Sequence, residues 1–375
     1  MTWHPRRGLA AIAALLALGG CDHSGPFADQ PSTVGPAGTA DPVRLTVNVE
    51  QDYWPTWAED GRGILYSFVN PGATGHRCIG LLPASGGTRI WEMCDNRIGE
   101  EDSVSSFTGY ALGSDGRLLY VEAVGDRNQP LTPIKTTLWL ADSSAPFSRS
   151  ALLTLPTFID TVGIAWLSDI AWTGPNTFIA LAQGFEIEAE PRPPCDDAED
   201  SVFANTGLVV TGTIASGRAT LQPVSGTTGA TGYSLAEDGA SIVFITHSNS
   251  YLFKVPAGGG SAVTVAPASI LANEELFGVS CKASLCVVAN TPASFPAHLP
   301  APCHFVDPGV RELSSVSLAT GTSQQLTSAN DVMVASQISP VTGDVVVQIG
   351  GNLGHVQSIR HPSNGDLYLY RGLVR

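Results

Sequence analysis

Short runs of alternating apolar and polar residues recur along the chain, and each is interrupted by a turn. The clearest example spans residues 57–68, where Trp57 and the run Ile64-Leu65-Tyr66 flank an Asp-Gly pair. Asp-Gly between two such runs indicates a β-hairpin, because both residues tolerate positive φ. Five later segments align with this one, and they begin at Leu112, Trp172, Leu235, Val279 and Ile338. A recurring hairpin cannot bury its own apolar face, so the pattern predicts an array of small sheets.

A second hairpin follows each first one, so each unit of the array contributes up to four strands. Third strands are predicted at 78–82, 137–140, 208–210, 251–255, 316–318 and 366–370. Outer strands are predicted after the first five of these, at 88–93, 152–155, 219–224, 262–265 and 324–327. The sixth unit therefore lacks an outer strand.

The missing strand is predicted at the other end of the array. Residues 43–49 alternate in polarity and directly precede the first hairpin. This segment can complete the sixth sheet and close the ring, which removes the exposed edges of an open array. The sequence therefore predicts one all-β domain over residues 43–375: a six-bladed β-propeller with four-stranded antiparallel blades, closed by an N-terminal strand.

The first hairpin also carries a family resemblance. Pro55, Trp57, the Asp60-Gly61 pair, Ile64 and Tyr66 resemble the repeat of TolB-type propellers. The resemblance implies the propeller fold for most of residues 43–375, and it is best in the first, second and fourth units. It implies no single function, because TolB-type repeats occur in envelope binding proteins, peptidase propellers and some sugar lyases. The separate N-terminal α/β domain of TolB has no counterpart in this sequence.

The N-terminus is typical of an exported protein. Two arginines precede the apolar run 8–18, which is too short to span a bilayer, so residues 1–20 are predicted to be a signal peptide. Leu18-Gly19-Gly20-Cys21 resembles the lipobox of bacterial lipoproteins, which implies that Cys21 is lipidated and becomes the first mature residue. The alternative is an ordinary secretory signal with a chance cysteine. Residues 21–42 are rich in Pro, Gly, Ser and Thr, which predicts a flexible tether from the membrane of the bacterial cell envelope.

Composition and charge limit the kinds of partner that the protein can bind. The chain has 40 Gly and 26 Pro, which suits many short strands joined by tight turns. Its net charge of −15 would repel phosphate backbones, so nucleic-acid binding is excluded. Contact with the membrane is expected through the lipid anchor alone, and the protein is expected to be a monomer.

Six cysteines remain in the mature chain besides Cys21, and an even number in an exported protein indicates disulfides. They are Cys78, Cys94, Cys195, Cys281, Cys286 and Cys303. The Ser-Gly-Gly turn at 85–87 places Cys78 opposite Cys94, and a four-residue turn places Cys281 opposite Cys286. The remaining two lie in Pro-rich insertions and are predicted to pair with each other. Free buried thiols are the alternative for all six.

The long connections of the propeller are expected to share one face, opposite the tight Asp-Gly turns. They carry a rim of acidic residues, predicted as a binding face: Glu100, Glu101, Asp102, Asp196, Asp197, Glu199, Asp200, Glu274 and Glu275. Asp52 is expected on the same rim. Such a rim can recognise a basic partner or coordinate Ca²⁺, or it can be a solvated surface that keeps the protein soluble.

No motif for a nucleophile elbow, a phosphate loop or a zinc protease is present, so no catalytic residue, cofactor or metal is predicted. Four tryptophans can form either an aromatic ligand cage or the packing between blades, and packing is the favoured interpretation: Trp54, Trp57, Trp166 and Trp172. The predicted function is a non-catalytic binding module for an envelope protein or glycan. The alternative is a polysaccharide lyase or hydrolase at the central channel, which converging His, Arg and carboxylate side chains would favour.

Overall fold

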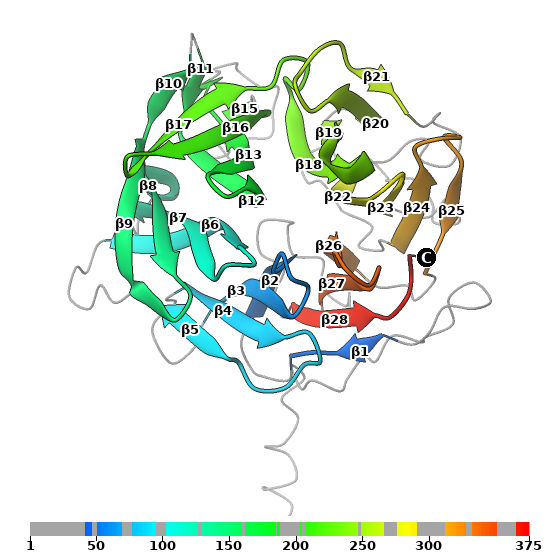
Figure 1. Cartoon of the computed structure of the whole chain (residues 1–375), viewed down its shortest axis with the longest axis horizontal. Coiled ribbons are helices and arrows are strands. Elements are labelled where there is room, and N and C mark those ends of the chain that lie inside the picture. The colour runs from blue at the N-terminus through cyan, green and yellow to red at the C-terminus, as the bar shows by residue number, and fades with distance from the viewer. Residues whose placement is uncertain are drawn as a thin grey trace, which may run out of the picture.

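Six four-stranded antiparallel sheets surround a central axis in the computed structural model, which confirms the predicted six-bladed β-propeller (Figure 1). The structure describes residues 42–46, 51–69, 77–94, 103–126, 129–159, 162–184, 186–187, 203–204, 207–246, 249–265, 276–290, 312–327, 332–350 and 365–374. Among them the single helical element is the 3₁₀ turn η2 (Glu237–Gly239).

The four strands of each blade follow one another from the axis outward. Blade one contains β2 (Gln51–Trp57), β3 (Gly63–Val69), β4 (Arg77–Pro83) and β5 (Trp91–Cys94). Blade two contains β6 (Ser103–Leu112), β7 (Arg117–Asp126), β8 (Gln129–Asp142) and β9 (Ala145–Leu155). Blade three contains β12 (Trp166–Gly174), β13 (Thr177–Gln183), β16 (Gly207–Ala215) and β17 (Arg218–Pro223).

The second half of the ring repeats this order. Blade four contains β18 (Ala230–Ala236), β19 (Ser241–Thr246), β20 (Asn249–Pro256) and β21 (Val263–Thr264). Blade five contains β22 (Phe277–Lys282), β23 (Leu285–Asn290), β24 (Glu312–Ser317) and β25 (Ser323–Gln325). Blade six contains β26 (Val332–Ile338), β27 (Val345–Gly350), β28 (Asp366–Tyr370) and β1 (Val43–Arg44). Two small hairpins stand apart from the blades: β10 (Thr157–Ile159) with β11 (Val162–Ile164), and β14 (Glu186–Ile187) with β15 (Phe203–Ala204).

The N-terminal strand closes the ring, as the sequence predicts. β1 pairs antiparallel with β28, so the outermost strand of blade six comes from the start of the fold (Figure 1). The pairing continues past β1, because the Leu45 amide donates to the Leu367 carbonyl at 2.8 Å. The Arg44 guanidinium lies 2.7 Å from the Asp366 carboxylate in a largely buried ion pair. Residues 47–49 of the predicted strand lie outside the described residues.

The second strand of each blade is buried on both faces, because each blade packs between two others. β3 reads Gly-Ile-Leu-Tyr-Ser-Phe-Val and is buried from Gly63 to Phe68. Its side chains divide between two apolar clusters: Leu65 packs toward blade two, and Ile64 packs toward blade six. Strands buried on both faces read as continuous apolar runs, which explains why these strands are readily visible in the sequence.

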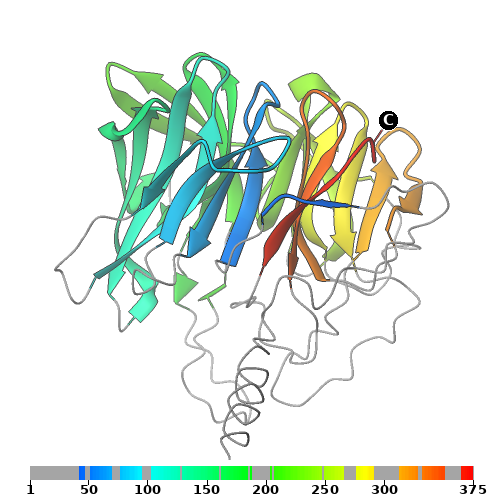
Figure 2. The same ribbon diagram turned by 90° about the horizontal axis from the view of Figure 1, so that it is seen from below.

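The hairpin turns fall on one face of the propeller, which Figure 2 shows from the edge. The Asp-Gly turns adopt the backbone that the sequence predicts, with φ of 70° at Gly61 and 85° at Gly116. The connections from the second to the third strand leave the opposite face. The Pro-rich insertions that contain Cys195 and Cys303, at residues 184–204 and 291–311, follow the last residues of β13 and β23 on that side.

Two of the predicted disulfides are present. Cys78–Cys94 joins β4 to β5 at the outer edge of blade one, and Cys281–Cys286 joins β22 to β23. In both, the partners lie directly opposite each other in the strand register. Cys195 and Cys303 lie outside the described residues, so their pairing stays a prediction.

The predicted signal peptide and lipidated Cys21 also lie outside the described residues. In the part of the chain that the structure describes, we find no helix with the length and apolar character needed to cross a membrane.

Candidate binding site in the central channel

The innermost strands of all six blades are irregular where they face the axis. Each breaks its pairing with the second strand at least once, between Tyr53 and Thr56, Phe107 and Gly109, Ser168 and Ala171, Ala230 and Gly232, Phe277 and Val279, or Met333 and Ser336. A bulge of this kind bends the strand and turns a side chain to a new direction. The six strands surround the centre of the ring in Figure 1, and residues at the bulges, such as Trp54, Thr108 and Asp169, line a common cavity.

That space is a cavity of about 560 Å³, and its lining comes from every blade. Residues from the six innermost strands include Trp54, Thr56, Thr108, Tyr110, Trp166, Ser168, Asp169, Thr231, Tyr233, Gly278, Ser336 and Gln337. Gln183 and Thr246, the last residues of β13 and β19, also line it. These strand ends lie on the face opposite the Asp-Gly turns. The cavity therefore reaches the face from which the acidic insertions depart.

The lining combines hydroxyls, amides, two indole rings and one carboxylate with apolar side chains such as Leu181, Ile245 and Val279. Asp169 is the single charged residue among the described residues that line the cavity. Trp54 is 47% exposed, and Trp166 is half-buried with its indole nitrogen donating to the Gln183 side-chain oxygen. Ser336 is only 2% exposed, and its hydroxyl has no hydrogen-bond partner among the described residues. Convergent polar groups and aromatic faces in a central cavity are typical of a small-ligand site.

Asp169 lies in an unusual electrostatic and backbone environment. The residue is exposed to solvent within the cavity, but the surrounding blades keep much of the bulk water away, and this desolvation raises the pKa of the carboxyl to about 6. The residue has φ of 46°, in the left-handed region, although it lies within β12. The Tyr233 hydroxyl from blade four donates to its backbone carbonyl at 2.5 Å.

Trp54 repeats this arrangement in blade one. Its φ is 48°, and the Tyr110 hydroxyl from blade two donates to its carbonyl at 2.5 Å. Its amide donates to the Gln348 side-chain oxygen at 3.1 Å. The indole of Trp54 is therefore presented to the cavity by a backbone that is fixed on both sides.

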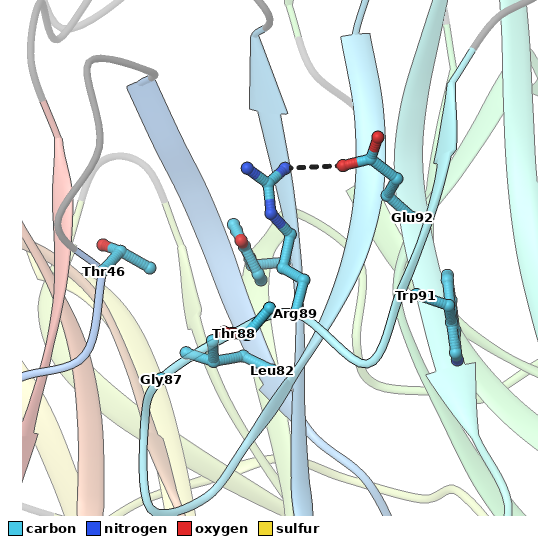
Figure 3. A pocket seen from close by; sticks show the side chains of 8 residues that line it. Thr46, Leu82, Gly87, Thr88, Arg89, Trp91 and Glu92 are labelled. Atoms are coloured by element: carbon cyan, nitrogen blue, oxygen red, sulfur yellow. Dashed lines mark ion pairs between the residues drawn. The ribbon is translucent and has the colours of Figure 1, made fainter.

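A second hollow, of about 390 Å³, lies on the outer side of blade one (Figure 3). Its most prominent group is Arg89, which pairs with Glu92 at 3.0 Å and stacks 4.0 Å from the centre of the Phe68 ring. Blade two repeats the arrangement, because Arg149 pairs with Glu122 at 3.1 Å and stacks on aromatic rings of its own sheet. An arrangement found in two blades supports the packing of the outer strands, so the central cavity is the better candidate site.

The predicted acidic binding face is not described by the structure. All nine of its residues lie outside the described ranges, and so do all eight histidines of the chain. Asp52, which was also expected on this rim, is described by the structure. It is fully buried within β2, so its predicted place on the rim is wrong. Among the described residues, no group of three or more His, Cys, Asp or Glu side chains gathers in a way that could hold a metal ion.

The prediction that the four tryptophans pack between blades is confirmed for two of them and wrong for the other two. Trp57 packs between blades, 8% exposed, with its indole nitrogen donating to the Gln337 carbonyl at 3.0 Å. Trp172 is half-buried beneath the Arg117 guanidinium. Trp54 and Trp166 line the cavity, so core packing is the wrong interpretation for these two. Asp169 was not predicted as a site residue, although an acidic residue within a largely apolar strand is a signal in the sequence that points to it.

Comparisons with known proteins agree on the fold. No protein-family model and no curated protein matches the sequence. Among solved structures, a luciferin-regenerating enzyme has a TM-score of 0.52 at 11% identity, over 88% of this chain and 96% of its own. XC5397 from Xanthomonas campestris, a gluconolactonase, has a TM-score of 0.51 at 10% identity, over 92% and 95%. TolB from Acinetobacter baumannii has a TM-score of 0.46 at 11% identity, over 82% and 63%. At these identities the likeness is one of fold alone, and the chain is defined as a six-bladed β-propeller.

Proposed function

We propose that this chain is an exported, lipid-anchored binding protein of the cell envelope that takes a hydroxylated ligand, such as the end of a glycan, in its central channel. The observation that carries the proposal is the central cavity, which all six blades line and to which five of them contribute hydroxyl, amide or indole side chains. Hydroxyl and amide side chains exchange hydrogen bonds with sugar hydroxyls, and an indole face packs against the apolar face of a sugar ring. The described lining contains one carboxylate and no basic residue. This favours binding over a reaction that needs both a general acid and a general base.

The proposal includes the cellular location of the protein. Disulfides persist in oxidising compartments, so the two bridges support export from the cytosol. Lipidation at Cys21 and the tether 21–42 would hold the propeller near a membrane. The acidic residues predicted in the insertions would then attract a basic group on an envelope protein or glycan.

Blocking the channel tests the proposal. Thr231 lines the cavity, so Thr231→Trp fills part of it, whereas Thr220→Trp on the outer strand β17 is a matched control. Binding of envelope glycan fragments to the mature chain is measured by isothermal titration calorimetry. We expect loss of binding in Thr231→Trp and wild-type binding in Thr220→Trp. Binding that survives the channel block but disappears when residues 184–204 and 291–311 are trimmed would place the site on the insertions instead.

One observation favours a second candidate, an enzyme at the same channel. A carboxyl with a pKa of about 6, such as that of Asp169, can exchange protons near neutral pH. A polysaccharide lyase or hydrolase would use it as a general acid or base. The check is release of reducing ends or unsaturated products from envelope polysaccharides, abolished by Asp169→Asn. Ligand binding without any product would leave the binding proposal in place and remove this one.

A further inference from the structure

Two side chains of the channel are held by a left-handed backbone conformation, which tryptophan disfavours and aspartate tolerates better. Trp54 and Asp169 both have φ near 50° within strands, and a third innermost strand has φ of 69° at Gly278. Glycine adopts this conformation freely and aspartate tolerates it, whereas a bulky residue such as tryptophan is a clear outlier there. Strained residues concentrate at functional sites, because the surrounding structure must stabilise them.

The surrounding structure does so in the same way at both positions. Tyr110 and Tyr233 are buried tyrosines of the next blade, and each donates its hydroxyl to the carbonyl of the strained residue. Both tyrosines follow a glycine, Gly109 or Gly232, at the bulge of their own strand. The fold therefore uses one device twice, in blades one and three, and each time it directs a side chain into the same cavity.

The two side chains define the chemistry of a ligand. Asp169 supplies the single charge among the described lining residues, so the complementary ligand carries one positive charge. Trp54 and Trp166 offer indole faces, which attract both a cation and the C–H face of a sugar ring. The hydroxyls around them, including that of Ser336, suit a body rich in hydroxyl groups. The net charge of −15 also raises the local concentration of cations.

We infer that Trp54 and Asp169 are the ligand-contacting pair of the channel, that Tyr110 and Tyr233 are their positioning residues, and that the ligand is a saccharide bearing one protonated amine. This inference rests on the proposed function, since it specifies the ligand of the same cavity. Two sources share this chemistry, a free amino sugar and the end of a glycan that carries unacetylated amino sugars.

Calorimetry with matched sugars tests the ligand class. The probes are glucosamine, its β-1,4-linked tetramer, the N-acetylated form of each, and glucose, all added to the mature chain at pH 7. We expect the amines to bind at least tenfold more tightly than their acetylated forms. Asp169→Asn removes that preference, whereas Trp54→Ala weakens amine and acetylated probes alike. Tighter binding of the tetramer identifies a glycan end as the source, and tighter binding of the monomer identifies a free amino sugar.

The pH profile tests the roles of Asp169 and its positioning tyrosine. The titratable groups that face Asp169 among the described residues are Tyr110 and Tyr233, and burial raises the pKa of both phenols, so neither ionises near neutrality. With a carboxyl pKa of about 6, amine binding is expected to weaken about tenfold from pH 7 to pH 5. The ligand amine is more fully protonated at pH 5, so the loss belongs to the protein.

Tyr233→Phe distinguishes positioning from mere packing. Loss of the hydroxyl frees the Asp169 backbone, so we expect a shifted midpoint of the pH profile and weaker amine binding. Tyr251→Phe, on the third strand of blade four, is the matched control and leaves the midpoint unchanged. The inference is overturned if amines and acetylated sugars bind equally well, or if Asp169→Asn keeps the preference, and in either case the proposed function survives. Absence of binding by every sugar, in a folded wild-type chain, overturns both.

Discussion

Asp169→Asn is expected to stabilise the propeller above pH 6, because the channel carboxyl is ionised there at a cost. Enclosure by the blades raises its pKa from 3.8 to about 6. A carboxyl whose folded pKa lies above its unfolded pKa binds its proton more tightly in the native state, so its ionised form destabilises the fold. The cost is fully present above pH 6, shrinks as the pH falls, and vanishes below about pH 4.

The size of the effect follows from the shift. A pKa unit corresponds to about 1.4 kcal/mol, so a shift of roughly two units gives an upper bound of about 3 kcal/mol. Asp169 is exposed to solvent in the cavity, and screening by water reduces the figure to about 1 kcal/mol. Asparagine tolerates the left-handed backbone of this position, so the substitution changes the charge and leaves the strain as it was.

Urea denaturation of the wild type and Asp169→Asn from pH 4 to pH 8 measures the difference in unfolding free energy. We expect the variant to be more stable by about 1 kcal/mol at pH 8 and equal to the wild type at pH 4. Carboxyls with a lowered pKa, such as Asp115 and Glu237, titrate in both chains and cancel in the difference. A difference that stays constant with pH, or a variant that is less stable at pH 8, would refute the reasoning.

Three further predictions concern the fold. Gly212→Ala is expected to cost about 2 kcal/mol by urea denaturation, because its Cβ would lie 2.0 Å from the Phe178 ring, whereas Gly258→Ala has open space and should change stability by less than about 0.5 kcal/mol. Arg44→Met leaves the Asp366 carboxylate without its ion-pair partner where the ring closes, so we expect the free energy of unfolding to fall by about 3 kcal/mol. An unchanged denaturation midpoint would contradict this prediction. Replacing both cysteines of the blade-one bridge by alanine should cost about 3 kcal/mol and the same change in blade five about 2 kcal/mol, because the first bridge closes the longer loop; equal losses would contradict this.

The sequence by itself determined the blades, their order and their closure. Asp-Gly turns and apolar second strands are local signals, since a turn residue needs a given φ wherever it lies and a strand buried on both faces must be apolar throughout. Cross-strand neighbours follow from the centre of a turn, which is why the Cys78–Cys94 and Cys281–Cys286 pairs were predictable. The closing strand was found by the same logic, because one outer strand was missing.

Only the tertiary structure determined which residues line the channel. Its lining residues come from eight strands spread over almost the whole propeller, and no local pattern states which of them converge. Packing between blades was the favoured interpretation for Trp54 and Trp166, because they lie at repeat positions, but bulges in the innermost strands turn side chains toward the axis. A bulge shifts the register by one residue, which exchanges the two faces of a strand, and the contacts that stabilise it come from the neighbouring blade. The hydroxyls of Tyr110 and Tyr233 are such contacts, and they exist only once the ring has formed.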